Sequence, residues 1–227
     1  MNPIMNKLEI DKLSYYSHSR EEMLEFIPPK TTRLLDISCG AGLFGSQVKK
    51  HLSDKVEVWG IEPIKLAADE ATKNLDYVLC DTIENSLEKL PDNFFDCITF
   101  NDVLEHLVYP EIVLSKVSRK LAPEGIIVAS IPNVRYFLVV IDLMLYRDWE
   151  YQEWGVLDKT HLRFFTEKSI SRLFDLSGYK IISKKGINSL PLAYKKHNMI
   201  LSACSFLFPQ YFDDMKYMNF AISAILK

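Results

Sequence analysis

A glycine-rich turn constrains this chain more than any other feature. Residues 36–45 read Asp-Ile-Ser-Cys-Gly-Ala-Gly-Leu-Phe-Gly, so Gly40, Gly42 and Gly45 form an intact GxGxxG. The apolar run Arg33–Ser38 predicts a strand before the turn, and apolar residues at helical spacing predict a helix after it. The first two glycines permit a tight turn and close ligand approach, and the third permits close helix–strand packing. The pattern predicts a strand–turn–helix unit that holds an anionic group at the helix N-terminus.

Strands and helices alternate along the chain on both sides of this turn. Further apolar strands are predicted at 56–61, 76–79, 95–100, 126–131, 179–184 and 219–226. Alternation of this kind is typical of a parallel sheet with helices on both faces. The sequence therefore predicts an α/β fold, a Rossmann-like three-layer α/β/α sandwich.

The domain organisation follows from length and from one break in the alternation. The 227 residues suit a single domain, 1–227. A lid helix is expected within 1–30, begun by a capping box at Ser19–Glu22 and ended by Pro28-Pro29. Residues 135–165 are rich in aromatic side chains, so we expect a cap-like insertion there, over the edge of the sheet where a substrate would bind.

Composition excludes several classes of protein. The net charge is −3 and 25% of residues are charged, which gives no footprint for nucleic acid. The four cysteines match no zinc or CxxC spacing, so we expect reduced thiols and a cytoplasmic location. No apolar stretch reaches the length of a membrane span. Monomer and homodimer both remain open.

Glu62, together with the glycine motif, indicates the kind of ligand that binds. It lies about 20 residues beyond the glycines, at the end of the second predicted strand, where a carboxylate can accept both hydroxyls of a ribose. Asp36 lies inside the strand end before Gly40, whereas the first glycine of a dinucleotide site follows its strand almost directly. The turn thus favours a nucleoside cofactor other than a dinucleotide.

Several short motifs together resemble one family. They are Asp36–Gly45, Glu62-Pro63, Cys80-Asp81-Thr82, Phe95–Ile98, Asn101–His106 and Pro123-Glu124-Gly125. This set resembles the class I S-adenosylmethionine-dependent methyltransferases of type 11/23. More loosely, the later segments resemble the MetW-like group and methyltransferases associated with polysaccharide enzymes. The resemblance implies a seven-stranded, mostly parallel sheet with an antiparallel last strand, S-adenosyl-L-methionine as cofactor and S-adenosyl-L-homocysteine as product.

The resemblance also implies roles for individual residues. Tyr16, Arg20, Gly40 and Gly42 would surround the methionine end, with Asp36 and Ser38 supporting the turn. Glu62 and Pro63 would meet the ribose, Asp81 and Thr82 the adenine, and Asn101 would line the floor near the sulfur. Ser38 stands where the family usually has glycine, and a serine is tolerable at this position if the backbone is extended.

The acceptor is expected to bind beyond the carboxyl ends of the strands. His161 is the candidate general base or acceptor-positioning group, since its ordinary pKa suits deprotonating a hydroxyl. The alternative is a histidine that only hydrogen-bonds its own loop. We expect in-line methyl transfer to a small-molecule or sugar acceptor, at oxygen, without metal ligands. A non-catalytic S-adenosylmethionine-binding or partner-assembly protein of the same fold is the alternative function, and a dinucleotide oxidoreductase is the third.

Overall fold

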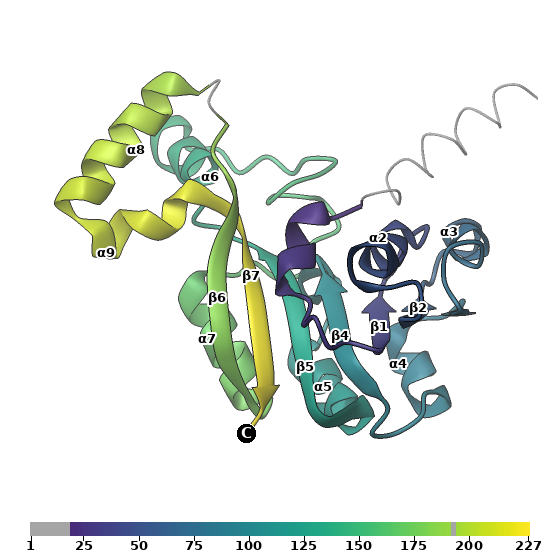
Figure 1. Ribbon diagram of the computed structural model, residues 1–227. Helices are drawn as coiled ribbons and strands as arrows, with labels where there is room; N and C mark the ends of the chain where they lie inside the picture. Colours follow the sequence, from purple (N-terminus) through teal and green to yellow (C-terminus); the bar gives the residue numbers. More distant parts are fainter. Residues whose placement is uncertain (1–18, 192–193) are drawn as a thin grey trace, which may run out of the picture.

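The strands follow the predicted alternation closely. The computed structural model describes residues 19–191 and 194–227. Its strands are β1 (Arg33–Ile37), β2 (Glu57–Ile61), β3 (Tyr77–Leu79), β4 (Phe95–Asn101), β5 (Leu121–Pro132), β6 (Tyr179–Ser189) and β7 (Tyr217–Leu226). They form one seven-stranded sheet in the order β3-β2-β1-β4-β5-β7-β6 (Figure 1).

The sheet is mixed only at one side. Strands β1 to β5 pair in parallel, whereas β7 pairs antiparallel with both β5 and β6. This confirms the predicted seven-stranded, mostly parallel sheet with an antiparallel last strand. The order reverses direction between β1 and β4, which places a topological switch point at their carboxyl ends, where ligands bind in open α/β sheets.

Helices cover both faces of the sheet. They are η1 (Glu21–Phe26), α2 (Leu43–Leu52), α3 (Lys65–Ala71), α4 (Ile83–Ser86), η2 (Leu87–Lys89), η3 (Leu104–His106), α5 (Pro110–Val117), η4 (Ser118–Lys120), α6 (Phe137–Ile141), the π-helix η5 (Asp142–Tyr146), α7 (Glu167–Leu176), α8 (Lys195–Leu207), α9 (Pro209–Phe212) and η6 (Asp213–Lys216). One apolar cluster joins the sheet to α4, α5 and α7, and a second joins it to η1, α2 and α3. The three predicted layers are therefore present.

Alternate residues of the central strands pack into the two apolar clusters, one on each face of the sheet. In β1, Leu34 packs in the cluster with α2, while Leu35 and Ile37 pack in the cluster with α5. All three side chains are 0% exposed. Because side chains alternate across a strand, a strand buried on both faces reads as a continuous apolar run. The three core positions Leu34, Leu35 and Ile37 are accordingly apolar, and Asp36 is the buried polar exception, bonded to Thr99 of β4.

A third apolar cluster lies outside the two sheet faces. It joins Tyr136 and Phe137 to Val156 and Leu157 of the same segment and to Leu201 of α8. Figure 1 shows α6 and α8 at the same end of the sheet. Residues 135–165 thus pack against the later helices, an arrangement that the aromatic composition alone did not indicate. That this segment caps an acceptor remains a prediction.

The N-terminal segment differs from its prediction. Residues 21–26 form a 3-10 helix whose N-cap is Arg20, in the left-handed region at φ 48°, without a side-chain cap bond. Ser19 instead lies before that position, so the predicted capping box is wrong. Met23 is 0% exposed and packs against the sheet, so burial of one side chain rather than capping holds this turn. Tyr16 and the rest of the predicted lid before residue 19 lie outside the described residues.

A capping box at Thr166 begins α7. The Thr166 hydroxyl oxygen accepts from the N–H of Ser169, and the Ser169 hydroxyl oxygen accepts from the backbone N–H of Thr166. Across the described ranges 19–191 and 194–227, the helices are too short or too polar to cross a membrane.

Candidate functional site

The glycine turn lies at the carboxyl end of β1 and leads into α2. Gly40 and Gly42 have φ of 54° and 77°, in the left-handed region where only glycine fits without strain. The Gly42 N–H donates to Cys39 O at 2.9 Å, and Asn74 Nδ2 donates to Ala41 O at 2.8 Å. Gly42 is also the N-cap of α2 and provides no side-chain cap. The start of α2 therefore presents backbone amides and a partial positive charge.

Glu62 supports this turn directly. Its Oε2 accepts from the Gly40 N–H at 3.0 Å and its Oε1 accepts from the Ile64 N–H at 2.9 Å. The side chain is only 3% exposed. Burial raises the pKa of Glu62, and the two backbone hydrogen bonds oppose that shift. Glu62 thus fixes the end of β2 to the glycine turn, a structural duty that the sequence interpretation did not include.

Ser38 corrects one expectation. Its backbone is not extended but left-handed, with φ of 57°. A non-glycine residue in this region costs about 1–2 kcal/mol, which explains why glycine is usual at this position in the family that the sequence resembles. The turn tolerates the cost because the neighbouring Cys39 N–H donates to Ile61 O at 3.0 Å and holds the backbone in place.

Gly45 has the packing role that its spacing predicted. A Cβ added there would lie 2.5 Å from Leu75 Cδ2 and 2.7 Å from Val58 Cγ1. Its φ is outside the left-handed region, so the requirement is for space rather than for conformation. The absence of a side chain lets α2 lie close against β2, which confirms the predicted close packing of helix and sheet.

Asp36 is buried beneath the turn at 2% exposure. Its Oδ1 accepts from Thr99 Oγ1 at 2.7 Å, so its carboxyl ties β1 to β4. Burial raises the pKa of Asp36 to about 7, the Thr99 hydrogen bond lowers it, and the nearby Glu62 raises it further.

The predicted adenine residues lie at the end of β3. Asp81 Oδ1 accepts from the Thr82 N–H at 2.8 Å and from Asn85 Nδ2 at 2.9 Å, and Oδ2 pairs with Lys89 at 2.8 Å. These bonds, with that from Lys89 first, lower the pKa of Asp81 to about 2. Thr82 is the N-cap of α4, and Pro63 is exposed beside Glu62. The carboxyl ends of β1, β2 and β3 thus bring the glycine turn, Glu62 and Asp81 to one edge.

Asn101 and Asp102 lie at the carboxyl end of β4, on the other side of the topological switch point from the glycine turn. Both polar atoms of the Asn101 amide are buried without a hydrogen-bond partner among the described residues. Asp102 accepts from Ser130 Oγ at 2.5 Å and Asn219 Nδ2 at 3.2 Å, and pairs with Arg20. Arg20 is therefore held near the ends of β4 and β5 by an ion pair that the motif reasoning did not foresee.

His161 lies in a polar cluster with the buried Glu105 and the half-buried His106. Its side chain is 5% exposed, its Nδ1 lies 3.0 Å from Val156 O, and its Nε2 lies 3.9 Å from Glu105 Oε1. Burial lowers the pKa of His161 most strongly, which favours the neutral ring. Sequence reasoning noted Glu105 and His106 in a motif, but it did not connect them to His161, which is far away in the sequence.

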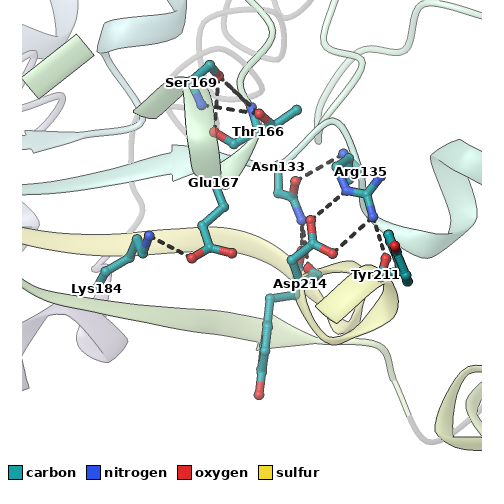
Figure 2. A network of polar contacts seen from close by, with 9 residues as sticks. Asn133, Arg135, Thr166, Glu167, Ser169, Lys184, Tyr211 and Asp214 are labelled. Atoms are coloured by element: carbon teal, nitrogen blue, oxygen red, sulfur yellow. Dashed lines mark hydrogen bonds and ion pairs between the residues drawn. The ribbon is translucent and has the colours of Figure 1, made fainter. Parts of the chain in front are cut away.

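Arg135 is occupied by a neighbour rather than open to an anionic acceptor. Figure 2 shows its guanidinium facing Asp214, with Nε at 2.6 Å from Oδ2 and Nη2 at 3.2 Å from Oδ1. Nη2 also donates to Tyr211 O at 2.5 Å. Asn133 donates from the same side to Asp214 O at 2.8 Å. This network fastens the segment after β5 to η6.

Comparisons with known proteins agree with this geometry. The methyltransferase domain family matches residues 10–184, so the chain belongs to that family. It is 26% identical over 207 residues to the mitochondrial ubiquinone biosynthesis O-methyltransferase of Dictyostelium discoideum, covering 85% of this chain and 63% of the relative. It is 33% identical over 108 residues to the ubiquinone biosynthesis O-methyltransferase of Bradyrhizobium diazoefficiens, covering 44% and 40%. The chain thus spans less than two thirds of these relatives.

Solved structures show the same fold at low identity. A S-adenosylmethionine-dependent methyltransferase from Archaeoglobus fulgidus superposes with a TM-score of 0.67 at 18% identity, covering 92% of this chain and 96% of that one. One from Aquifex aeolicus gives 0.61 at 16% identity and covers 100% of both chains. Family and fold together define the class as the class I S-adenosylmethionine-dependent methyltransferases, which confirms the resemblance in the sequence.

Proposed function

We propose that this chain transfers a methyl group from S-adenosyl-L-methionine to a hydroxyl oxygen of a small-molecule acceptor. The observation that carries the proposal is the joining of the glycine turn to Glu62 at the carboxyl ends of β1 and β2. The proposal of an oxygen nucleophile is supported by the relatives named as O-methyltransferases.

The cofactor would lie across the edge formed by β1, β2 and β3. Its carboxylate would face the amides at the start of α2, beside Gly40 and Gly42. Glu62 would accept from the ribose hydroxyls, because a carboxylate oxygen that holds one N–H retains capacity for a second donor. Asp81 and Thr82 would flank the adenine. The unpaired Asn101 amide supports a ligand on the β4 side, since buried polar groups are normally bonded.

In this reaction the main task of the protein is to place the cofactor and the acceptor relative to one another. The sulfonium methyl is already activated, so the protein must hold nucleophile and methyl in line at about 3 to 3.5 Å and exclude water. Residues 135–165 would close over the acceptor. Of the two roles considered for His161, general base and acceptor positioning, we assign it to acceptor positioning. The reason is that its Nε2 faces a buried carboxyl instead of open solvent.

The test is calorimetric titration with S-adenosylmethionine, S-adenosylhomocysteine and NAD, followed by a labelled-methyl transfer screen. The screen covers polyhydroxylated aromatic compounds, sugar nucleotides and small metabolites. Binding of both sulfur nucleosides without NAD, and label transfer to a hydroxyl compound, supports the proposal. NAD binding alone overturns it. Cofactor binding without transfer to any acceptor favours the non-catalytic alternative.

A further inference from the structure

The cluster of Glu105, His106 and His161 has no explanation in the cofactor site. One ligand atom from each residue, a carboxylate oxygen or a ring nitrogen, lies within 4.8 Å of the other two. Glu105 and His106 belong to η3, directly after β4, and His161 comes from the loop before α7. We propose that these three side chains form a binding site for a divalent transition-metal ion of the zinc type.

Glu105 provides the first argument. Its side chain is 0% exposed, and neither carboxylate oxygen has a hydrogen-bond partner among the described residues. A buried carboxylate without compensation is strongly unfavourable, so such a group is either protonated or paired with a cation. Arg20 does not compensate it directly, because that guanidinium pairs with Asp102. A metal ion would compensate the charge and bind the free oxygens.

The two histidines provide the second argument. His161 Nδ1 lies 3.0 Å from Val156 O, and His106 Nδ1 lies 3.2 Å from Thr160 O. Since a carbonyl oxygen can only accept, each of these contacts fits a ring that is protonated at Nδ1, the tautomer in which Nε2 carries the lone pair. Metal-binding histidines commonly show this arrangement, because the carbonyl fixes both the tautomer and the ring orientation. Here the same arrangement occurs twice, in rings whose centroids are 4.8 Å apart.

The backbone holds the cluster together without an ion. The Glu105 carbonyl accepts from the N–H groups of Leu162 at 2.8 Å and Arg163 at 3.0 Å. These bonds attach the His161 loop to η3, so the three side chains converge through main-chain contacts. In a tetrahedral zinc site the ligand atoms lie roughly 3.4 Å apart. Small side-chain torsions would therefore bring the widest pair together by roughly 1.5 Å on binding.

The donor set indicates the kind of ion. Two imidazole nitrogens and one carboxylate oxygen suit zinc, cobalt or a similar metal, whereas magnesium prefers oxygen ligands. Three protein ligands leave an open coordination position for water or another oxygen. The cluster adjoins Asp102 at the carboxyl edge of the sheet. If the proposed function holds, the open coordination position of the metal would bind an acceptor oxygen. Only this contact with the acceptor rests on the proposed function; the metal site itself does not.

The test uses the whole 227-residue chain, freed of any purification tag and stripped of bound metal with a chelator. Titration with Co²⁺ reports the site through its visible d–d absorption, and calorimetry with Zn²⁺ gives the affinity. Glu105→Gln removes the charge while keeping the shape, and His106→Gln removes a ligand that is partly exposed. His51→Gln is the matched control, because His51 is an exposed histidine in the last turn of α2.

The expected result is one equivalent of Co²⁺ bound by the wild type and by His51→Gln. Binding should be weaker by at least about tenfold in Glu105→Gln and in His106→Gln. Zn²⁺ should raise the melting temperature of the wild type but not that of Glu105→Gln. No absorption band, or equal affinity in all four proteins, overturns the proposal. The assay needs neither cofactor nor acceptor, so its result is independent of the proposed function.

The acceptor step has its own readout. The rate of methyl transfer should fall when the metal is removed by chelation, and it should recover when Zn²⁺ is added back. Unchanged transfer by a protein that binds Co²⁺ in stoichiometric amount leaves the metal site in place and overturns only its contact with the acceptor.

Discussion

The Glu62 carboxylate accepts a hydrogen bond from the backbone N–H of Gly40 at 3.0 Å, across the carboxyl ends of two neighbouring strands. The same side chain holds the N–H of Ile64 through its other oxygen. A residue predicted only to bind a ribose therefore also shapes the turn that would receive the methionine end of the cofactor. The two halves of the proposed nucleoside site depend on one carboxylate.

Replacing Glu62 by Ala should weaken S-adenosylmethionine binding by about 1–3 kcal/mol, the range for lost hydrogen bonds to a charged group. Calorimetric titration gives this loss directly. The exposed Glu111 on α5 is the matched control, and Glu111→Ala should bind as the wild type does. Unchanged affinity in Glu62→Ala would remove Glu62 from the cofactor site.

Asp36 should make stability depend on pH. Its pKa is about 7 in the folded protein and 3.8 ordinarily, so between these values the folded state binds a proton that the unfolded chain lacks. Stability conferred by the protonated group is therefore greatest at low pH and falls as the pH rises toward 7. Asp36→Asn should reduce this slope and be more stable than wild type at pH 8, by about 1–3 kcal/mol. The exposed Asp54→Asn is the control in urea unfolding at several pH values, and an unaltered slope contradicts the burial argument.

Gly45→Ala should destabilise the fold by steric overlap. The new Cβ would overlap Leu75 and Val58, and overpacking of this size costs about 1–3 kcal/mol, offset in part by the better helix propensity of Ala. The loss should be smaller in a Leu75→Val background, which a double-mutant cycle measures. Lys50→Ala, on the exposed side of α2, should change stability little. Equal costs in both backgrounds would show that Leu75 is not the limiting contact.

The cysteines should differ in reactivity, and one of them reports on the adenine. Cys39 and Cys97 are buried, and burial raises the pKa of both thiols, so iodoacetamide should not modify them in the folded protein. Cys80 is exposed beside Asp81 and should react. S-adenosylhomocysteine should slow labelling of Cys80 but not of Cys204 on α8, as measured by peptide mass spectrometry. Equal rates with and without the nucleoside would place the adenine elsewhere.

The strands of the sheet could be located from the sequence because the patterns that define a strand are local. Apolar runs, glycine turns and helical spacing are set within a few residues, so β1 and its turn were predicted at nearly their observed bounds, and a helix was expected directly after the turn. Errors arose where a contact from elsewhere decides the backbone. Ser38 is left-handed because the surrounding turn holds it there, and Arg20 takes the N-cap position while Met23 is buried against the sheet.

The site was predictable only in part for the same reason. Gly40, Glu62 and Asp81 follow successive strands, so strand order alone brings them to one edge. The approach of His161 to Glu105 depends on main-chain bonds between a loop and η3, and no periodic pattern records such contacts. The one available signal was the pair Glu105-His106, which follows β4 directly.

The position of β7 has a consequence for how the protein is made. This strand, near residue 220, lies between β5 and β6 and is paired on both sides. While the chain is being synthesised, β5 has an open edge until residues 217–226 leave the ribosome, and β6 has no neighbour at all. The parallel part, β1 to β5, can assemble before β7 has been synthesised, but the sheet closes only once residues 217–226 have emerged. Until then chaperones would meet an intermediate in which the edge of β5 is unpaired, and the pairing of β7 would be the step that removes this edge.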